Sequence, residues 1–515
     1  MLTVHCDNGR SDCDRKLTAV SISAGCMDAD VLERACISLG GVDAHIGVVT
    51  ANSEGLDEDE ESFMDVLNAV RRCDIAMMKI HSDPSYFKKF DRFRTAVEKA
   101  GVPFFLECNA PEVMKDFRDC FGYPDEDYDL LCRYVKLGGE SNSRGILLWA
   151  CSRLCGMDGV AVPEPEAPRA QGIYHPSLGP GSDEEGYLES LDPSRPSVGV
   201  IFHQKYWVEG NTDHIDALIG ALESKGANVI PVFAITSPSA ITGSDGIIET
   251  VKRYFVRDGR PRIGSVIVNM GFSQISLANP GEGEGSRAMY NFFEDLDIAV
   301  LQATALSRPR SVWEEDTVGM GPVELSTSVI WPEFDGQIIT VPLSFMEKDG
   351  QGSYRNAFVP DRVDRIASLA VSWARLRSLP PSEVRAVVML NMYPPSNDRL
   401  GGAGGLDTFE SIRSMMMAMK DKGYVIDHIP ETAQEIVDEL MAGVTNDLEW
   451  VPPEEIPGRA ADMVGLERYM EWFFSVPKVP REAMCRNWGD PPGEITTLDG
   501  RFIIPGVRNG NLFIG

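Results

Sequence analysis

A glycine-rich segment carries the strongest sign of binding chemistry in this sequence. Residues 387–412 read VVMLNMYPPSNDRLGGAGGLDTFESI, in which an apolar run leads into clustered glycines and then into a helical pattern. Glycines let a backbone come close to a ligand, and the exposed amides at a helix N-terminus attract anions. The segment therefore predicts a site for a phosphate or a carboxylate, formed by Asn391, Arg399, Gly401, Gly402, Gly404, Gly405 and Asp407.

Two features refine this prediction. Arg399 can pair with an anionic group through two parallel hydrogen bonds, and Asp407 with Glu410 has the spacing of a capping box. The segment lacks the Gly-Lys-Ser/Thr ending of a P-loop, and its glycines do not follow the GxGxxG pattern of dinucleotide-binding proteins. A flexible connecting loop explains the same glycines about as well, so both interpretations remain open.

A second candidate site is a loop rich in histidine and aromatic residues, IFHQKYWVEGNTDHIDAL, which follows an apolar strand pattern. Ligands of doubly wound sheets bind at the carboxyl ends of the strands, and polar groups beside large aromatics suit a flat, carboxylated organic ligand. We predict His203, Glu209 and His214 as substrate-binding residues. The two histidines lie eleven positions apart, which does not fit a short-spaced zinc motif. The more frequent role of such a histidine is structural.

A third candidate lies in VIWPEFDGQIITVPLSF, where Glu333 and Asp335 occupy a proline-flanked turn between apolar runs. A carboxylate pair can hold a cation or transfer a proton. Asp-Gly between two strands is also an ordinary hairpin signal. We favour the turn for Asp335 and leave Glu333 open as a site residue.

Composition excludes several classes of partner. The 515 residues carry a formal net charge of -30, which repels a phosphate backbone and an anionic membrane surface. We therefore expect neither a nucleic acid nor a membrane surface among the partners. The apolar runs are too short to span a bilayer, and early charges replace the apolar core of an export signal. A cytoplasmic location is expected, in which the 11 cysteines are reduced.

The order of apolar and amphipathic stretches predicts the fold. Strand patterns at 17–22, 45–49, 75–80 and 103–106 alternate with helical patterns at 63–72 and 86–100. This spacing is typical of parallel strands joined by crossover helices. We predict a multidomain α/β protein made of several Rossmann-like parallel-sheet units.

Composition also suggests the domain boundaries. Residues 1–160 form a cysteine-rich α/β domain, 161–197 a linker rich in proline, glycine and acids, and 198–379 a second α/β domain. The third α/β domain, 380–515, is expected to contain strands at 385–390 and 424–426 and helices at 408–422 and 433–442. It ends on an apolar strand pattern, 501–515, so we expect it to be incomplete and the parent protein to continue.

Several motifs in one order resemble a known family. They are YVKLGGESN (134–142), GIYHP (172–176), the loop with His203, PEFDGQI (332–338), the glycine-rich segment and the closing PGVRNGNLFIG. Together they resemble the N-terminal part of the cobaltochelatase large subunit (CobN), a family shared with the H subunit of magnesium chelatase. The likeness runs from about residue 73 to residue 515.

The resemblance implies insertion of a divalent metal into a tetrapyrrole. It favours cobalt and hydrogenobyrinic acid a,c-diamide, an intermediate of cobalamin biosynthesis, with magnesium and protoporphyrin as the alternative. ATP would be hydrolysed by separate AAA+ partner subunits, in agreement with the missing P-loop. Carboxylates or histidines near the ring would accept its N–H protons, and Arg399 with the glycine-rich loop would hold ring carboxylates.

One family motif does not occur in this sequence. The histidine- and glycine-rich HGxxE followed by LPG is absent, and we expect it, with the catalytic residues, downstream of Gly515. The chain alone is therefore predicted to be inactive. A non-catalytic tetrapyrrole or metal carrier is the alternative from another functional class.

Overall fold

The computed structural model describes most of the chain: residues 3–23, 26–80, 83–108, 110–157, 159–179, 182–279, 290–348, 354–449, 451–493 and 495–515. The chain divides into two compact units, Met1–Arg377 and Ser378–Gly515. The first unit contains two large sheets and the second contains two small ones. The finer division at 160 and 198 remains a prediction.

The first sheet has the strand order β1-β3-β2-β4-β5. Its strands are β1 (Thr3–Asp7), β2 (Lys16–Ser23), β3 (His45–Asn52), β4 (Ile75–Lys79) and β5 (Phe104–Glu107). Only β1, at the edge, is antiparallel to its neighbour. The four strands predicted in this region are confirmed. They could be predicted because strands that are buried on both faces have continuous apolar runs in the sequence.

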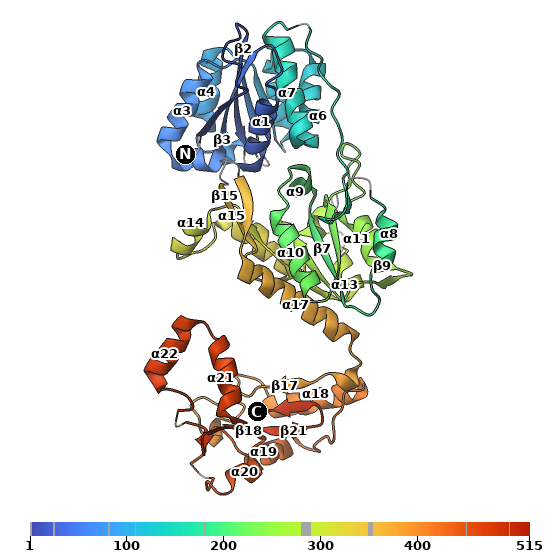
Figure 1. Ribbon diagram of the computed structural model, residues 1–515, viewed down its shortest axis with the longest axis vertical. Helices are drawn as coiled ribbons and strands as arrows, with labels where there is room; N and C mark the ends of the chain where they lie inside the picture. The colour runs from blue at the N-terminus through green and yellow to red at the C-terminus, as the bar shows by residue number, and fades with distance from the viewer. Residues whose placement is uncertain are drawn as a thin grey trace. The chain divides into compact units, whose positions relative to one another are not determined.

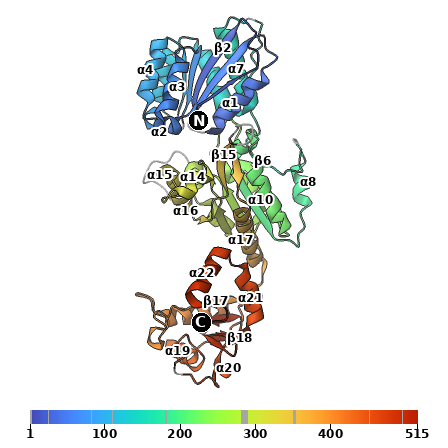
Figure 2. The same ribbon diagram turned by 60° about the vertical axis from the view of Figure 1, so that its left-hand side comes forward.

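Helices cover both faces of this sheet (Figures 1 and 2). One face packs against α1 (Cys26–Ser38), α6 (Asp125–Leu137) and α7 (Gly139–Leu154). The other packs against α3 (Glu60–Val70) and α4 (Phe90–Ala100). Five of the cysteines whose side chains are described are buried as free thiols, in agreement with small core residues: Cys36, Cys73, Cys108, Cys132 and Cys151.

The second sheet has the order β14-β12-β11-β7-β8-β6. Its strands are β6 (Gly172–Ile173), β7 (Ser197–His203), β8 (Asn228–Ala234), β11 (Ser265–Asn269), β12 (Ala299–Gln302) and β14 (Ile338–Ile339). All are parallel except β6, which comes from the segment predicted as a linker and pairs with β8. One face packs against α10 (Asp213–Ser224) and α17 (Pro360–Ser378), the other against α11 (Ile247–Phe255) and α13 (Phe292–Leu296).

Shorter elements complete the first unit. They are α2 (Ser53–Glu58), α5 (Pro111–Cys120), α8 (Glu184–Glu189), α9 (Gln204–Val208), β9 (Val256–Arg257), β10 (Arg260–Pro261), α12 (Gln274–Ala278), α14 (Arg310–Glu315), α15 (Pro322–Leu325) and α16 (Trp331–Phe334). A third sheet consists of β13 (Ala305–Leu306), β15 (Ser344–Lys348) and β16 (Tyr354–Phe358).

The second unit is built around two three-stranded sheets. The first sheet places β22 (Leu512–Ile514) between β17 (Ala386–Val388) and β21 (Val507–Asn509), and α18 (Thr408–Asp421) and α19 (Ala433–Ala442) share its core. The other sheet joins β18 (Asp462–Gly465), β20 (Arg501–Ile504) and β19 (Thr497–Leu498). The described residues of this unit also form the α-helices α20 (Ile456–Arg459), α21 (Leu466–Ser475) and α22 (Lys478–Trp488).

Two predicted strands of the second unit are wrong. Residues 424–426 form no strand, although the Val425 carbonyl accepts a hydrogen bond from the Asn511 amide at 2.8 Å. The amides that follow it bind the Asn509 side chain, which turns the chain away from a strand pairing. The closing segment forms three strands instead of one. Gly506 (φ 122°) separates β20 from β21, and Gly510 (φ 61°) lies in the turn that reverses the chain between the antiparallel β21 and β22.

The predicted α/β class is confirmed: parallel strands and crossover helices form both large sheets. Among the described residues, no helix has the length and apolar character needed to cross a bilayer.

Candidate functional site

Both large sheets have a topological switch point. The parallel strands run β3-β2-β4-β5 in the first sheet and β8-β7-β11-β12 in the second. Among the parallel strands of each sheet, the first along the chain (β2 or β7) is an inner strand, the second lies on one side of it and the third lies on its other side. The helices after β2 and β4, α1 and α4, cover opposite faces, as do those after β7 and β11. This arrangement opens a crevice at the carboxyl ends of the two inner strands, where ligands of such sheets bind.

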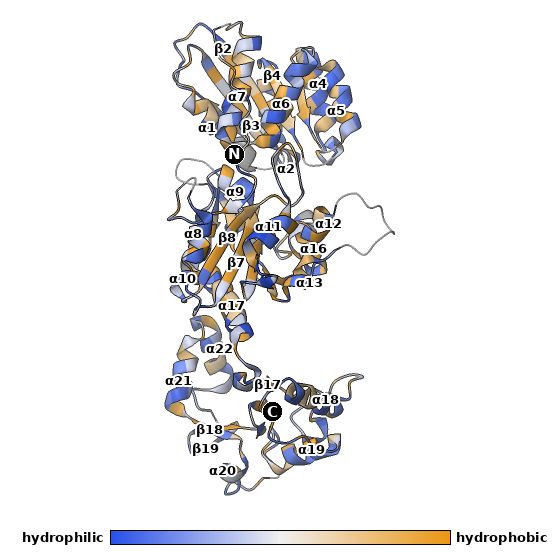
Figure 3. Cartoon of the chain, turned by 90° about the vertical axis from the view of Figure 1, so that its right-hand side faces the viewer, coloured by the Kyte–Doolittle hydropathy of each residue, from blue (hydrophilic) through white to orange (hydrophobic). Residues whose placement is uncertain are grey.

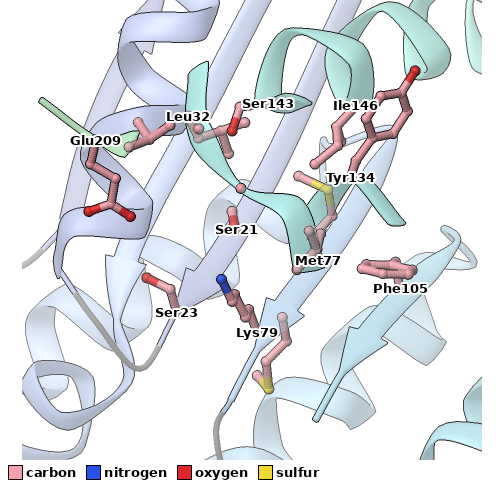
Figure 4. A pocket seen from close by; sticks show the side chains of 15 residues that line it. Ser21, Ser23, Leu32, Met77, Lys79, Phe105, Tyr134, Ser143, Ile146 and Glu209 are labelled. Carbon is pink, nitrogen blue, oxygen red and sulfur yellow. The ribbon is translucent and has the colours of Figure 1, made fainter. Parts of the chain in front are cut away.

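The crevice of the first sheet is a small cavity of about 70 Å³. Figure 4 shows Ser21, Ser23 and Lys79 at the ends of neighbouring strands, with Glu209 opposite them. The start of α7, with Gly138 and Gly139, also lines it. Sites for drug-sized ligands occupy roughly 300–1,000 Å³, so this cavity admits water or a small ion but not a tetrapyrrole.

Glu209 reaches this cavity from the loop that follows β7. Its carbonyl accepts a hydrogen bond from the Arg34 guanidinium at 3.0 Å, and Lys205 Nζ lies 3.6 Å from its carboxylate. Gly139 (φ 80°) allows this close approach, because a Cβ there would lie 2.8 Å from Val208 Cγ1. The predicted site residue Glu209 therefore belongs to the first sheet's cavity, although its sequence neighbours belong to the second sheet.

The two predicted histidines have different roles. His203 caps α9, where its Nδ1 accepts a hydrogen bond from the Lys205 amide at 3.1 Å. His214 is completely buried, and its Nε2 donates to Asn269 Oδ1 at 3.2 Å at the carboxyl end of β11. Burial lowers the pKa of His214 to about 4, so the ring is neutral near pH 7.

Asp335 and Glu333 also separate. The turn predicted for Asp335 is confirmed at Asp335 and Gly336 (φ 79°), but it joins α16 to the short β14 and not two strands of a hairpin. The Asp335 carboxylate is buried and accepts hydrogen bonds from Ser273 Oγ and the Gln274 amide, each at 2.6 Å. Glu333 is exposed. The described residues contain no cluster of three or more histidine, cysteine or acidic side chains that could hold a metal ion.

The glycine-rich segment forms an ordered loop in the second unit. The Gly401 amide donates to the Asn391 carbonyl at 2.9 Å, and the Asn391 side chain donates to the Gly402 carbonyl at 3.0 Å. Thr408 Oγ1 donates to the Gly401 carbonyl at 2.6 Å. Gly401 (φ 68°) is required here, since a Cβ would lie 2.8 Å from the Phe409 ring. Internal hydrogen bonds therefore use part of the backbone that we predicted for an anion.

The rest of this loop is more open. Arg399 is exposed, with its Nε 3.5 Å from the Asp398 carboxylate. Space is free around the Cα atoms of Gly404 and Gly405, the latter with φ 77°. The Asp407 side chain accepts the Glu410 amide at 3.1 Å, as half of the predicted capping box, whereas Glu410 pairs with Arg413. The loop thus contains Asn391, Arg399, the four glycines and Asp407, all of which belong to the second unit.

One feature has no counterpart in the predictions. Phe272 precedes α12 and Trp331 begins α16, far apart in sequence, yet their ring centroids lie 5.6 Å apart. Their exposed fractions are 46% and 43%. The spacing of apolar residues in the sequence does not reveal this pair, because the backbone is irregular at both places. Phe272 has a positive φ angle, and a π-helical turn precedes Trp331.

Comparison with known proteins decides the family. The model of the CobN/Magnesium Chelatase family matches residues 132–515. The chain belongs to this family. The aerobic cobaltochelatase subunit CobN of Pseudomonas aeruginosa is 29% identical over 399 residues, which cover 76% of this chain and 30% of that protein. The chloroplastic magnesium-chelatase subunit ChlH of Oryza sativa is 27% identical over 360 residues, 67% of this chain and 24% of that protein.

A solved structure supports the fold of this CobN/magnesium chelatase family member. The catalytic subunit of cobaltochelatase from Mycobacterium tuberculosis superposes with a TM-score of 0.61 at 23% identity, covering 97% of this chain and 38% of that one. The chain thus spans less than two fifths of the length of each of these proteins.

Proposed function

We propose that this chain forms the N-terminal part of the large subunit of a metal chelatase, a ligase that forms nitrogen–metal bonds. The substrates are a divalent metal, cobalt, and the tetrapyrrole hydrogenobyrinic acid a,c-diamide, in cobalamin biosynthesis. The observation that carries the proposal is the family match over residues 132–515, which include the glycine-rich loop and the PEFDGQI segment.

The chemistry assigns separate tasks. The ring N–H protons must leave as the metal enters, which requires a base near the ring nitrogens. Ring carboxylates need cationic or amide partners, and exposed Arg399 beside the glycines of its loop is suited to them. His214 is neutral near pH 7 but buried against Asn269. It therefore holds the Asn269 side chain at the second sheet's crevice and does not act as the base. AAA+ partner subunits hydrolyse ATP, consistent with a sequence that lacks a P-loop.

Magnesium insertion into protoporphyrin IX is the second candidate. Relatives that carry the two names are similarly distant, at 29% and 27% identity. A tetrapyrrole or metal carrier without catalysis is the third candidate, because the HGxxE motif does not occur in these residues.

Titration of the purified chain with hydrogenobyrinic acid a,c-diamide and, separately, with protoporphyrin IX tests the choice of ring. Saturable binding of the corrinoid alone supports the cobalt branch, and preference for the porphyrin transfers the proposal to magnesium. Metal insertion by the large subunit with its AAA+ partners then tests the activity. If that complex inserts no metal into either ring, the chelatase proposal fails and the carrier remains.

A further inference from the structure

An exposed group of aromatic side chains lies beside the second sheet. Phe272 and Trp331, here called the aromatic platform, are 46% and 43% exposed. Phe272 precedes α12, and Trp331 begins α16. Figure 3 shows α12 and α16 as neighbours beside this sheet. Phe272 follows the carboxyl end of β11, one of the two strands of the switch point, so the platform lies where ligands of such sheets bind.

Phe272 is held in a conformation that a phenylalanine avoids. Its φ of 67° lies in the left-handed region, where a Cβ crowds the backbone. Its amide donates to the Thr327 carbonyl at 2.7 Å, and its carbonyl accepts from Gln274 Nε2 at 3.2 Å. Gln274 is fully buried and also accepts from Thr236 Oγ1 at 2.7 Å. The surroundings therefore impose the strained conformation, a situation that is common at ligand sites.

The strain does not serve burial of the ring. A strained residue whose ring fills the core improves packing, but almost half of the Phe272 side chain faces solvent. The backbone thus holds an apolar ring outward against Trp331. A glycine at this position would adopt the same φ without strain, so the aromatic ring itself is the reason for a phenylalanine here.

The partner side of the platform is equally rigid. Trp331 follows a π-helical turn, Ser326–Ile330, inserted between α15 and α16, and such turns often occur at functional sites. Asp335, directly after α16, fastens this helix to the start of α12 through Ser273 and Gln274. The buried Asp335 carboxylate therefore links the two backbone segments that carry the rings. Because the segments are already ordered, less conformational entropy is lost when a ligand binds to the rings.

We propose that the aromatic platform binds the tetrapyrrole ring, which stacks on one aromatic ring of the platform and contacts the edge of the other. This inference rests on the proposed function and locates part of its substrate contact on this chain. The two ring planes are inclined at 41°, and a conjugated macrocycle is stabilised both by offset stacking and by edge contact with such rings. The first sheet's cavity of about 70 Å³ cannot take such a ring.

Two substitutions separate binding from folding. Phe272→Gly removes the ring and relieves the strained φ, so the melting temperature is expected to stay unchanged or rise. Trp331→Ala removes the second ring at an exposed position. Each is expected to weaken tetrapyrrole binding by about tenfold, the typical loss of a stacking contact. The matched control is Trp373→Ala, which truncates a tryptophan of similar exposure (38%) on α17 and should leave binding unchanged.

Equilibrium dialysis and the absorbance shift of the bound ring, with protoporphyrin IX and hydrogenobyrinic acid a,c-diamide as separate probes, measure the affinities. Weaker binding by both platform variants but not by the control supports the platform. Equal binding by all variants overturns it and leaves the chelatase proposal standing. If the unmodified chain binds neither probe, the platform proposal is also wrong, while metal insertion by the large subunit with its partners still decides the function.

Discussion

The two large sheets share one winding but differ at the edge where a ligand would enter. In the first, α7 and the loop with Glu209 close the switch point around a cavity of about 70 Å³. In the second, a layer of buried polar side chains supports an exposed aromatic surface: His214, Asn269, Gln274, Gln302 and Asp335 are each at most 3% exposed. Topology thus determines where a crevice forms, and the side chains at the strand ends determine whether a large ring can reach it.

The largest expected effect concerns the polar layer of the second sheet. Asp335→Ala should lower the free energy of unfolding by about 3 kcal/mol, because it leaves the buried Gln274 amide and the partly buried Ser273 hydroxyl without this acceptor. Urea unfolding monitored by tryptophan fluorescence measures it. Glu333→Ala, two residues away and exposed, is the control and should change stability by less than about 0.5 kcal/mol. Equal effects of the two variants would refute the supporting role of Asp335.

The next effect is a pH dependence of the second sheet. The pKa of His214 is lowered to about 4 by burial, below the value of about 6.5 in an unfolded chain. The contribution of His214 to the free energy of unfolding is therefore fully present above pH 6.5. It decreases as the pH falls toward 4, and at pH 4.5 it has decreased by about 2.5 kcal/mol. The first sheet behaves oppositely at Glu33, whose pKa is raised by burial, so that its protonation favours the folded state.

A variant isolates the histidine from such groups. Thermal unfolding of the unmodified chain and of His214→Phe, each at pH 7 and pH 4.5, gives the difference in pH dependence between them. We expect the variant to lose less stability on acidification than the unmodified chain. Parallel losses in both proteins would show that His214 is accessible to protons in the folded state.

A smaller effect tests the packing beneath the second sheet. A Cβ at Gly264 would lie 2.7 Å from the Ala374 Cα and 2.9 Å from its carbonyl oxygen on α17. Gly264→Ala should therefore destabilise the chain by about 2 kcal/mol through overpacking. Gly220→Ala on α10, where a Cβ meets nothing within 4 Å, should stabilise it by about 1 kcal/mol. Calorimetric melting of both variants checks these opposite signs.

The smallest effect concerns the closed cavity of the first sheet. Ser143 lines it from α7. Ser143→Ala should stabilise the chain by about 0.5 kcal/mol, since alanine favours a helix and the cavity makes little demand on the hydroxyl. Ser141→Ala, on the same helix but exposed, should give the same gain in a urea titration. If only the Ser143 variant loses stability, the cavity holds an ordered group bound to this hydroxyl. The ligand-entry edges of the two large sheets would then be more alike.

Sequence reasoning predicted the first unit better than the second for a physical reason. Strands such as β4 and β11 are buried on both faces, so continuous apolar runs reveal them. In the second unit, the closing segment contains enough apolar residues for one long strand, but the positive φ angles of Gly506 and Gly510 divide it. Local composition did not show which glycines reverse the chain.

The candidate sites show the same limit. The sequence brought Asn391, Arg399 and the glycines into one loop because they are neighbours along the chain. It did not show that Glu209 would reach the first sheet or that Asp335 would cap α12, because tertiary contacts make both arrangements. Phe272 carried no signal, since its unusual φ depends on Thr327 and Gln274.

The placement of β22 has a consequence for biosynthesis. β17 pairs with β22 in parallel, so residues 386–388 meet residues 512–514, while the intervening chain supplies α18, α19 and the second small sheet. On the ribosome, β17 therefore emerges long before β22, which lies beside it in the sheet order β17-β22-β21. Such distant pairings form late. Until β22 has been synthesised, β17 has no neighbour in this sheet, and an unpaired strand edge of this kind favours aggregation.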